Sequence, residues 1–333
     1  MADGVRDKVL ETVEHYKMLK SGDKVIVALS GGSDSVTLLH CLKSLEAELG
    51  ITVYACHINH NLRGKDSDSD QAYVQRLCEK TATPLRAFSV DVSGTVRKHQ
   101  STEERARELR YETFGRLSEE LGAKVATAHN ACDNSETVLM NMLRGTGLKG
   151  LCGIPPVRDY LIRPLLWCTK EEILGYCKEN GLEYVTDMTN FSTAYTRNKV
   201  RIELMPKLTE INPSLIDTIG RMTKNLTSDS EFLEGMAREA LDGARLGEGV
   251  YASEKLKVLP PPIFSRGVSL MLREKGIEPT ALRINGFMGI ITEGIGKINI
   301  EKNKFAVVRK GKAEIQIITQ NYRKKHEKNT EIS

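Results

Sequence analysis

The sequence predicts an α/β fold: a mostly parallel sheet with helices on both faces, followed by a smaller, mostly helical C-terminal domain. Short apolar runs alternate with longer amphipathic segments through the first half of the chain, which is typical of βαβ units. After residue 212 the alternation stops and long helical segments dominate. We therefore expect one domain over residues 1–212 and a second over residues 213–333.

The expected strands of the first domain are near-continuous apolar runs, as in sheets that are buried on both faces. They cover residues 24–30, 51–59, 84–92 and 124–129, with a short fifth strand in "LIRPLL" (161–166). Helices are expected over residues 1–20, 34–49, 66–82, 101–122, 133–143 and 169–181. This order predicts a Rossmann-like parallel sheet, in which ligands bind at the carboxyl ends of the strands.

The second domain is expected to consist of three long helices and two short β-like runs. The helices cover residues 213–245, 262–275 and 280–293, and the runs "FAVVR" and "AEIQII" are joined around Gly311. Residues 301–333 contain nine Lys or Arg and four Glu, a local charge of +5. This basic end is either a solubilising tail or a contact for nucleic-acid phosphates.

Composition excludes several classes of protein. The formal net charge of +4 does not by itself indicate a nucleic-acid partner, and no apolar run reaches membrane-spanning length. The first twenty residues lack the apolar core of a signal peptide. The seven cysteines form no C-x-x-C pair, so we expect neither a disulfide framework nor a zinc or iron–sulfur site. We expect a cytoplasmic protein without a membrane partner.

The stretch "ALSGGSDSVTLLH" (28–40) follows the first apolar strand and opens a helix. Glycines at this position let the backbone approach a ligand, and the free N–H groups of the helix start favour an anion. The common phosphate-binding patterns G-x-x-x-x-G-K-[ST] and G-x-G-x-x-G are absent. Asp34 among these donors predicts Mg²⁺, which bridges carboxylate and phosphate oxygens. The alternative is an ordinary turn in which Ser and Asp cap the helix.

Two further polar segments follow expected strands. They are "HINHNLRG" (57–64) and "AHNACDNSET" (128–137). Because the carboxyl ends of parallel strands meet at one edge of the sheet, we expect all three segments to converge there.

The loop Ser30–Ser35 resembles the pyrophosphate-binding loop of the N-type ATP pyrophosphatases, which cleave ATP between its α- and β-phosphates. Three more stretches resemble the tRNA(Ile)-lysidine synthetases within that group: "HINHNLRGKDSDSD", "ATAHNACDNSETVLMNMLRGTGLKGL" and "DMTNFSTAYTRNKVRIELMPKL". "STEERARELRY" (101–111) matches as well, and the order agrees over about residues 20–210. The chain departs from the family where Cys132 precedes a single acid, Asp133, and where Asn134 stands in place of a frequent glutamine.

The resemblance implies an enzyme that ligates lysine to C2 of the wobble cytidine of tRNA(Ile) with a CAU anticodon. In that reaction the cytidine O2 attacks the α-phosphate of ATP and releases pyrophosphate, and the lysine ε-amine then displaces AMP. The implied substrates are ATP, L-lysine and the tRNA, with Mg²⁺ as the metal.

The resemblance also implies roles for individual residues. The pyrophosphate ligands would be Ser30, Gly31, Gly32, Ser33, Asp34 and Ser35. Asp133 and Glu136 share one helix face and would hold the substrate lysine, with Asp34 and Asp133 as metal ligands. The catalytic candidates are Asp34, His129, Asp133, Arg144, Arg197 and Arg201.

Some of these roles have a structural alternative. His129 could be a structural histidine, and Arg197 and Arg201 could pair with local acids such as Asp187 instead of phosphate. Glu103, Arg107, Arg110 and Tyr111 form a helical face that suits either ion pairing or function. Trp167 is expected to pack locally. A further group of residues could frame the ATP or the cytidine: His57, Asn59, His60 and Arg63.

Three other functions remain open. A tRNA thiolase would commonly use cysteine pairs, which this sequence lacks, and a GMP-synthetase-like ligase would need a glutaminase. A non-catalytic nucleotide-binding module would not need Asp34 and Asp133, which are both present. The oligomeric state stays open, with a homodimer as one arrangement.

Overall fold

The computed structural model describes residues 3–59, 65–90, 92–95, 101–185 and 196–318. Contacts between residues divide the chain into two units, Met1–Leu226 and Thr227–Ser333. The division falls inside helix α11 (Leu215–Ala244), so this one helix contributes to both units. The domain boundary expected between residues 212 and 213 lies just before this helix and stays a prediction.

The first unit contains a six-stranded sheet in the order β3-β2-β1-β4-β6-β5. Its strands are β1 (Lys24–Ala28), β2 (Thr52–Asn59), β3 (Leu85–Ser89), β4 (Ala123–Ala126), β5 (Val157–Arg158) and β6 (Leu161–Ile162). All neighbouring pairs are parallel except β5 and β6, which form an antiparallel pair at one edge. The strand order places the carboxyl ends of β1, β2 and β4 side by side, as the sequence pattern predicts.

Helices connect these strands. They are α1 (Asp3–His15), α2 (Ser33–Ser44), α3 (Glu46–Leu49), α4 (Lys65–Lys80), α5 (Thr102–Leu121), α6 (Ala131–Leu143), α7 (Leu148–Leu151) and α8 (Lys170–Glu179). A 3₁₀ turn, η1, covers Ser93–Thr95. Beyond α8 follow α9 (Thr196–Lys199), the π-helical segment η3 (Val200–Leu204) and α10 (Met205–Ile211).

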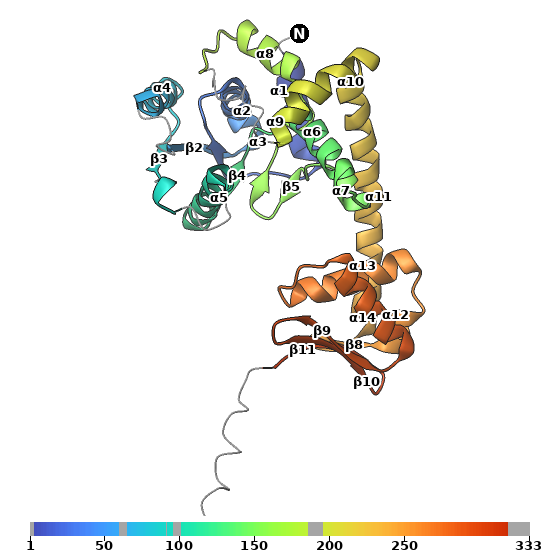
Figure 1. Ribbon diagram of the computed structural model, residues 1–333. Coiled ribbons are helices and arrows are strands. Elements are labelled where there is room, and N and C mark those ends of the chain that lie inside the picture. The colour runs from blue at the N-terminus through green and yellow to red at the C-terminus, as the bar shows by residue number, and fades with distance from the viewer. Residues whose placement is uncertain (1–2, 60–64, 91, 96–100, 186–195, 319–333) are drawn as a thin grey trace, which may run out of the picture. The chain divides into compact units, whose positions relative to one another are not determined.

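Both faces of the parallel sheet are covered, because successive residues of a strand point to opposite sides. Val25 and Val27 pack in a core cluster with residues of α1, α2 and α8. Ile26, between them, packs in a separate cluster with Phe114 and Leu117 of α5. Figure 1 shows α2 and α5 on opposite sides of the strands. This arrangement confirms the predicted α/β fold.

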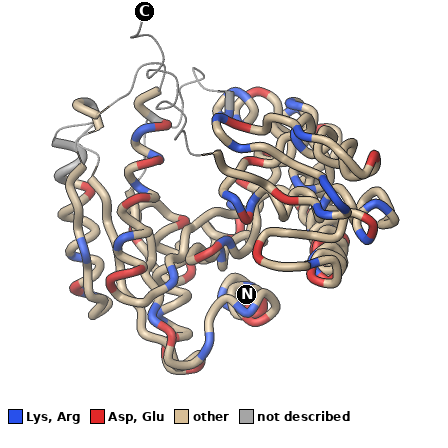
Figure 2. The backbone as a smooth tube through the Cα atoms, turned by 90° about the horizontal axis from the view of Figure 1, so that it is seen from below, with Lys and Arg blue, Asp and Glu red and all other residues tan. Residues whose placement is uncertain are grey.

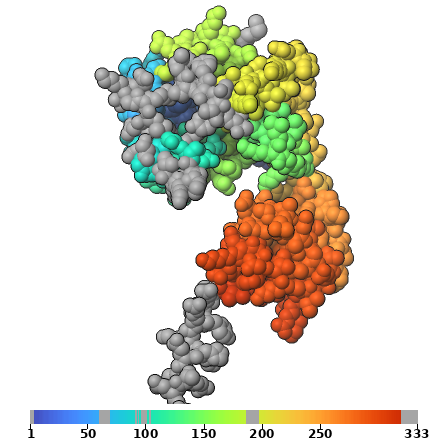
Figure 3. Space-filling model, viewed as in Figure 1, coloured from blue at the N-terminus to red at the C-terminus, as the bar shows by residue number. Residues whose placement is uncertain are grey.

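The second unit has its own core, in which three helices and the end of α11 pack on an antiparallel sheet. The helices are α12 (Ser253–Lys257), α13 (Pro261–Glu274) and α14 (Ala281–Glu293). The strands are β7 (Arg245–Gly247), β8 (Val250–Ala252), β9 (Gly296–Glu301), β10 (Lys304–Arg309) and β11 (Lys312–Ile317), in the order β7-β8-β11-β10-β9. This unit is coloured orange to red in Figure 3.

The long helices α11, α13 and α14 and the hairpin β10–β11 confirm the expectations from the sequence, whereas the five-residue helix α12 was not expected. The strands β7, β8 and β9 were not expected, since β7 and β8 have only three residues each and β9 contains only two strongly apolar residues, Ile298 and Ile300. Figure 2 shows Lys and Arg interspersed with Asp and Glu along the described chain. Among the described residues, no helix combines the length and the apolar character needed to cross a membrane.

Candidate functional site

The loop between β1 and α2 has a backbone that only glycine adopts easily. Gly31 has φ +95°, in the left-handed region, and a Cβ there would also press against Tyr73 at 3.4 Å. Gly32 is the N-cap of α2, and within the described chain no side chain caps this helix start. The first N–H groups of α2 therefore remain for an anion, as helix geometry predicts.

Ser35 holds the loop together from inside. Its buried hydroxyl donates to the carbonyl of Gly32 at 2.9 Å and accepts from the backbone N–H groups of Ser30 and Gly31, each at 3.2 Å. The hydroxyl hydrogen is thereby engaged within the loop. Ser30 is exposed, its hydroxyl lies 3.1 Å from that of Ser35, and it accepts from the N–H of Gly32 at 3.4 Å.

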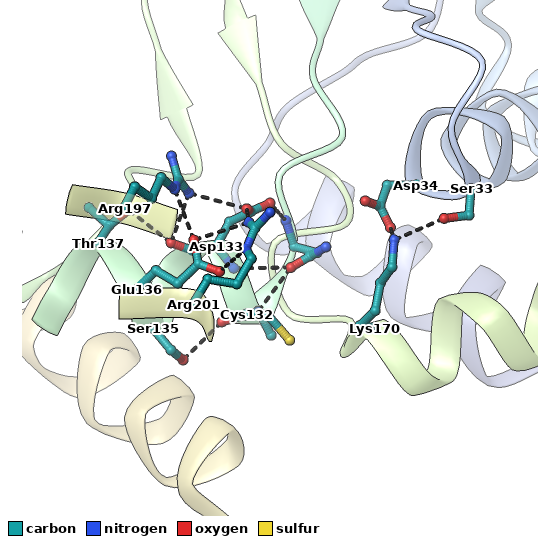
Figure 4. A network of polar contacts seen from close by, with 12 residues as sticks. Ser33, Asp34, Cys132, Asp133, Ser135, Glu136, Thr137, Lys170, Arg197 and Arg201 are labelled. Carbon is teal, nitrogen blue, oxygen red and sulfur yellow. Dashed lines mark hydrogen bonds and ion pairs between the residues drawn. The ribbon is translucent and has the colours of Figure 1, made fainter. Parts of the chain in front are cut away.

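Asp34 lies in the first turn of α2 and forms an ion pair with Lys170, the first residue of α8. Lys170 Nζ is 2.7 Å from Asp34 Oδ1 and 2.9 Å from Ser33 Oγ (Figure 4). Sequence reasoning missed Lys170. Its only signal is a position at the start of a helix that follows the strand "LI", where a parallel strand ends at the ligand-binding edge.

The start of α6 brings Asp133 and Glu136 onto one face, as their spacing predicts. Asn130 caps the helix by accepting from the N–H groups of Cys132 and Asp133, and Asp133 Oδ2 accepts from the N–H of Asn130 at 3.1 Å. This reciprocal capping box fixes the Asp133 side chain. The start of α6 also lies near α8, because Ala131 N donates to the carbonyl of Cys168 at 2.9 Å.

Arg197 and Arg201 are one helical turn apart, and both bind the two acids of α6 (Figure 4). Arg197 Nε is 2.8 Å from Glu136 Oε2, and its Nη2 is 3.1 Å from Asp133 Oδ1. Arg201 Nε is 2.5 Å from Glu136 Oε1, and its Nη2 is 2.9 Å from Asp133 Oδ1 and 3.1 Å from Glu136 Oε2. We call these four residues the α6 charge network.

The α6 charge network contains two acids and two arginines, so it has no net formal charge, and it is partly buried. Glu136 is only 2 % exposed, and both of its oxygens accept from arginine. The pKa of Arg201 is raised, because its bond to Glu136 and the charges of both acids outweigh the opposing effect of burial. The local pairing that sequence reasoning offered as an alternative for the arginines therefore occurs, although the partners are Asp133 and Glu136. Asp187 lies outside the described residues.

His129 follows β4, and its Nδ1 is 3.0 Å from the hydroxyl of Thr127. Burial lowers the pKa of this histidine to about 4, and the positive charges of Arg163, Arg197 and Arg107 act in the same direction. Asp133 opposes this effect and is outweighed. At neutral pH the imidazole is therefore uncharged, so it can form hydrogen bonds to a ligand but is a poor proton donor.

Mg²⁺ usually binds one or two protein carboxylates together with phosphate oxygens and water. Among the described residues, no group of three or more His, Cys, Asp and Glu could hold a metal alone. Asp133 already accepts from two arginines through Oδ1 and from the backbone through Oδ2. Asp34, by contrast, meets Lys170 through Oδ1 alone among the described residues. The donor set fits a nucleotide-bound Mg²⁺ at Asp34 better than at Asp133.

Not every candidate joins this site. Arg144 is exposed and caps the far end of α6, eleven residues beyond Asp133 and therefore about 16 Å along the helix axis. His57 is buried and its Nδ1 lies 2.9 Å from the carbonyl of Leu29, which supports a structural role. Asn59 is also buried and donates to Gln71 at 3.3 Å. His60 and Arg63 lie outside the described residues.

The helical face of α5 carries an arginine stacked on a tyrosine. The guanidinium of Arg107 is 5.0 Å from the ring centre of Tyr111, and that of Arg158 is 5.8 Å from the same ring. Such cation–π pairs stabilise a surface by about 0.5–1 kcal/mol, so they account for the pattern on structural grounds. The side chain of Glu103 lies outside the described residues.

A family model described as a PP-loop domain matches residues 3–208. The chain belongs to the PP-loop family. The matched range contains the loop Ser30–Ser35, Lys170 and the whole α6 charge network, so every element of the site described above lies within the PP-loop domain.

The PP-loop chain is also similar to curated tRNA(Ile)-lysidine synthases. It is 43 % identical to that of Clostridium tetani over 232 residues, which cover 68 % of this chain and 50 % of the relative. It is 41 % identical to that of Porphyromonas gingivalis over 266 residues, covering 79 % of this chain and 58 % of the relative. The chain thus spans about half the length of the curated relatives it matches.

Among solved structures, the U34-tRNA thiolase of Methanococcus maripaludis, described with its 4Fe–4S cluster, is similar in fold. The match has a TM-score of 0.57 at 22 % identity and covers 67 % of this chain and 77 % of the thiolase. This likeness supports the PP-loop fold and does not bear on the reaction.

Proposed function

We propose that this PP-loop chain ligates L-lysine to C2 of the wobble cytidine of tRNA(Ile) with a CAU anticodon, using ATP and releasing AMP and pyrophosphate. The observation that carries the proposal is the identity of 37–43 % to curated lysidine synthases across most of the chain. We further propose that residues 1–212 form the adenylation domain, that residues 213–333 contact the tRNA, and that the protein acts in the cytoplasm.

In the first step the cytidine O2 attacks the α-phosphorus of ATP, and the bond to the β-phosphate breaks. The N–H groups at the start of α2 and the exposed Ser30 hydroxyl are suited to bind the leaving pyrophosphate. Asp34 would hold Mg²⁺, which neutralises charge on the phosphate oxygens. Among the described residues the contacts of Arg197 and Arg201 use Nε and Nη2, so Nη1 of each is suited to bind the α-phosphate.

In the second step the ammonium of lysine loses a proton, the resulting ε-amine attacks C2, and the C2–O bond to AMP breaks. Glu136 is almost fully buried, and both of its oxygens bind arginines, which suits it to orient them. Asp133 is more exposed, and among the described residues its Oδ2 accepts one backbone N–H, which leaves a lone pair for the substrate ammonium. We therefore assign the lysine contact to Asp133 first and to Glu136 second. The neutral imidazole of His129 is suited to bind a phosphate oxygen through its N–H.

The direct test is transfer of labelled lysine to unmodified tRNA(Ile) in the presence of ATP and Mg²⁺. We expect transfer by the native chain and none by Asp34→Ala or Asp133→Ala. Transfer that survives both substitutions would contradict the assigned site. No lysine transfer, together with tRNA-dependent ATP cleavage and uptake of sulfur from a donor, would instead identify a tRNA thiolase.

A further inference from the structure

Lys170 bridges the starts of two helices. Its ammonium reaches from the first residue of α8 to Asp34 and Ser33 in the first turn of α2 (Figure 4). Asp34 and Lys170 remain accessible, with side-chain exposures of 29 % and 39 %. An ammonium group has three N–H donors, and these two contacts use two of them. Within the described part of the chain, one N–H donor of Lys170 is therefore left beside the loop.

The ammonium of Lys170 lies where two helix dipoles disfavour a positive charge. The N-terminus of a helix carries a partial positive charge, and a cation there is disfavoured by about 0.3–1 kcal/mol. Lys170 is at the N-terminus of α8, and its ammonium contacts the N-terminal turn of α2, so both helix dipoles repel it. Asp34 supplies one compensating negative charge. An anion in the loop would supply more.

Lys170 is not needed to pack α8 against α2. That contact is made farther along both helices by Thr37 with Cys177, at 3.1 Å, and by His40 with Tyr176, at 2.8 Å. The start of α8 is capped by Thr169 and Glu172 in a reciprocal capping box. Replacement of Lys170 should therefore leave the fold of this region intact.

We propose that Lys170 is a further phosphate-binding residue of the loop, which donates to the β- or γ-phosphate of ATP and to the pyrophosphate product. In this structure Lys170 neutralises Asp34. If Asp34 holds the Mg²⁺ of a bound nucleotide, the ammonium of Lys170 would keep its contact with Ser33 and donate to a phosphate oxygen. The proposal rests on the proposed ATP-dependent function but needs neither tRNA nor lysine.

The test is calorimetric binding of ATP, AMP and inorganic pyrophosphate, each with Mg²⁺, to the native chain and to Lys170→Ala. A charge-assisted hydrogen bond contributes about 1.5–3 kcal/mol, so we expect roughly 10- to 100-fold weaker binding of ATP and pyrophosphate. AMP lacks both outer phosphates, and its affinity should change less than about twofold. Lys170→Arg should recover part of the lost affinity, since it keeps the charge.

Lys178→Ala is the matched control, because Lys178 lies in the last turn of the same helix and is exposed. It should leave all three affinities unchanged. The proposal would be overturned if Lys170→Ala and the native chain bound pyrophosphate with equal affinity. It would also be overturned if Lys170→Ala lost equal affinity for ATP and AMP, because that result would indicate a purely structural ion pair. These measurements need no tRNA. If pyrophosphate binding depends on Lys170 but the chain does not transfer lysine, the proposed reaction is refuted and the role of Lys170 in phosphate binding stands.

Discussion

The two groups of charged residues at this site are built differently. Asp34 has one ammonium partner, and both members of that pair are partly exposed. In the α6 charge network, two carboxylates and two guanidiniums share five side-chain hydrogen bonds around Glu136, which is 2 % exposed. A single accessible pair exchanges partners at low cost, whereas a buried network resists exchange. We infer that Asp34 changes partners during the reaction and that the α6 network persists.

The largest expected effect on stability comes from removing the buried carboxylate of the α6 charge network. Glu136→Ala leaves Arg197 and Arg201 to share one carboxylate, and removal of one partner of a buried ion pair destabilises strongly. Because both arginines are partly exposed, we expect a loss of about 2–4 kcal/mol in the free energy of unfolding. Urea unfolding followed by the fluorescence of Trp167, the single tryptophan, measures it.

The matched control for that variant is Glu120→Ala. Glu120 forms an exposed ion pair with Arg86, with side-chain exposures of 60 % and 57 %. We expect less than about 0.5 kcal/mol from its removal. Similar losses in the two variants would contradict the idea that burial makes the α6 network permanent.

The second prediction concerns pH and tests the burial of His129 and, to a smaller extent, the positive charges near it. The unfolded chain protonates His129 near its ordinary pKa of about 6.5, and the folded chain does so only near about 4. The stabilising effect of this neutral histidine is complete above pH 6.5 and is lost as the pH falls toward 4. We expect His129→Gln to lose less stability than the native chain over this interval, by the order of 1–3 kcal/mol. If the unfolding free energies of the two chains fell equally with pH, His129 would be excluded as a source of this pH dependence.

A smaller effect is expected when the geometry of the network changes and its charge does not. In Arg201→Lys one ammonium replaces a guanidinium that donates from two nitrogens to both acids. We expect a loss of about 1–2 kcal/mol in unfolding free energy and at least a tenfold slower lysine transfer. Arg86→Lys, on the exposed surface, serves as the control. An unchanged transfer rate would show that charge alone suffices at position 201.

The smallest effect on stability is expected at Asp34, despite the largest expected loss of activity there. Asp34→Asn removes one charge of an accessible pair, so its unfolding free energy should change by less than about 1 kcal/mol. Lysine transfer should fall at least 100-fold, because the metal and phosphate contacts are lost. A large destabilisation would instead indicate that this pair is part of the framework, like the α6 network.

The sequence predicts the fold of the first unit well because its signals are local. Apolar runs mark β1, β2, β3 and β4, and the capping boxes at Ser101 and Asn130 mark the starts of α5 and α6. The second unit is less predictable, since β9 alternates weakly and β7 and β8 are too short for a pattern.

The site is predictable only where its residues are close in the sequence. The loop Ser30–Ser35 and the shared face of Asp133 and Glu136 follow from spacing. Lys170 is 136 residues from Asp34, and the arginines are 61 to 68 residues from the acids they bind. Such contacts depend on which strands are neighbours and on how loops end, and neither is encoded in a short motif.

The hydroxyl of Ser35 has a consequence for the thermodynamics of ligand recognition. Its four hydrogen bonds to Ser30, Gly31 and Gly32 hold the loop in shape from within the chain. The loop therefore loses its conformational entropy when the chain folds and not when the ligand arrives. Association with ATP should be rapid and require little rearrangement, and a Ser35→Ala chain should bind the same ligand with a larger unfavourable entropy.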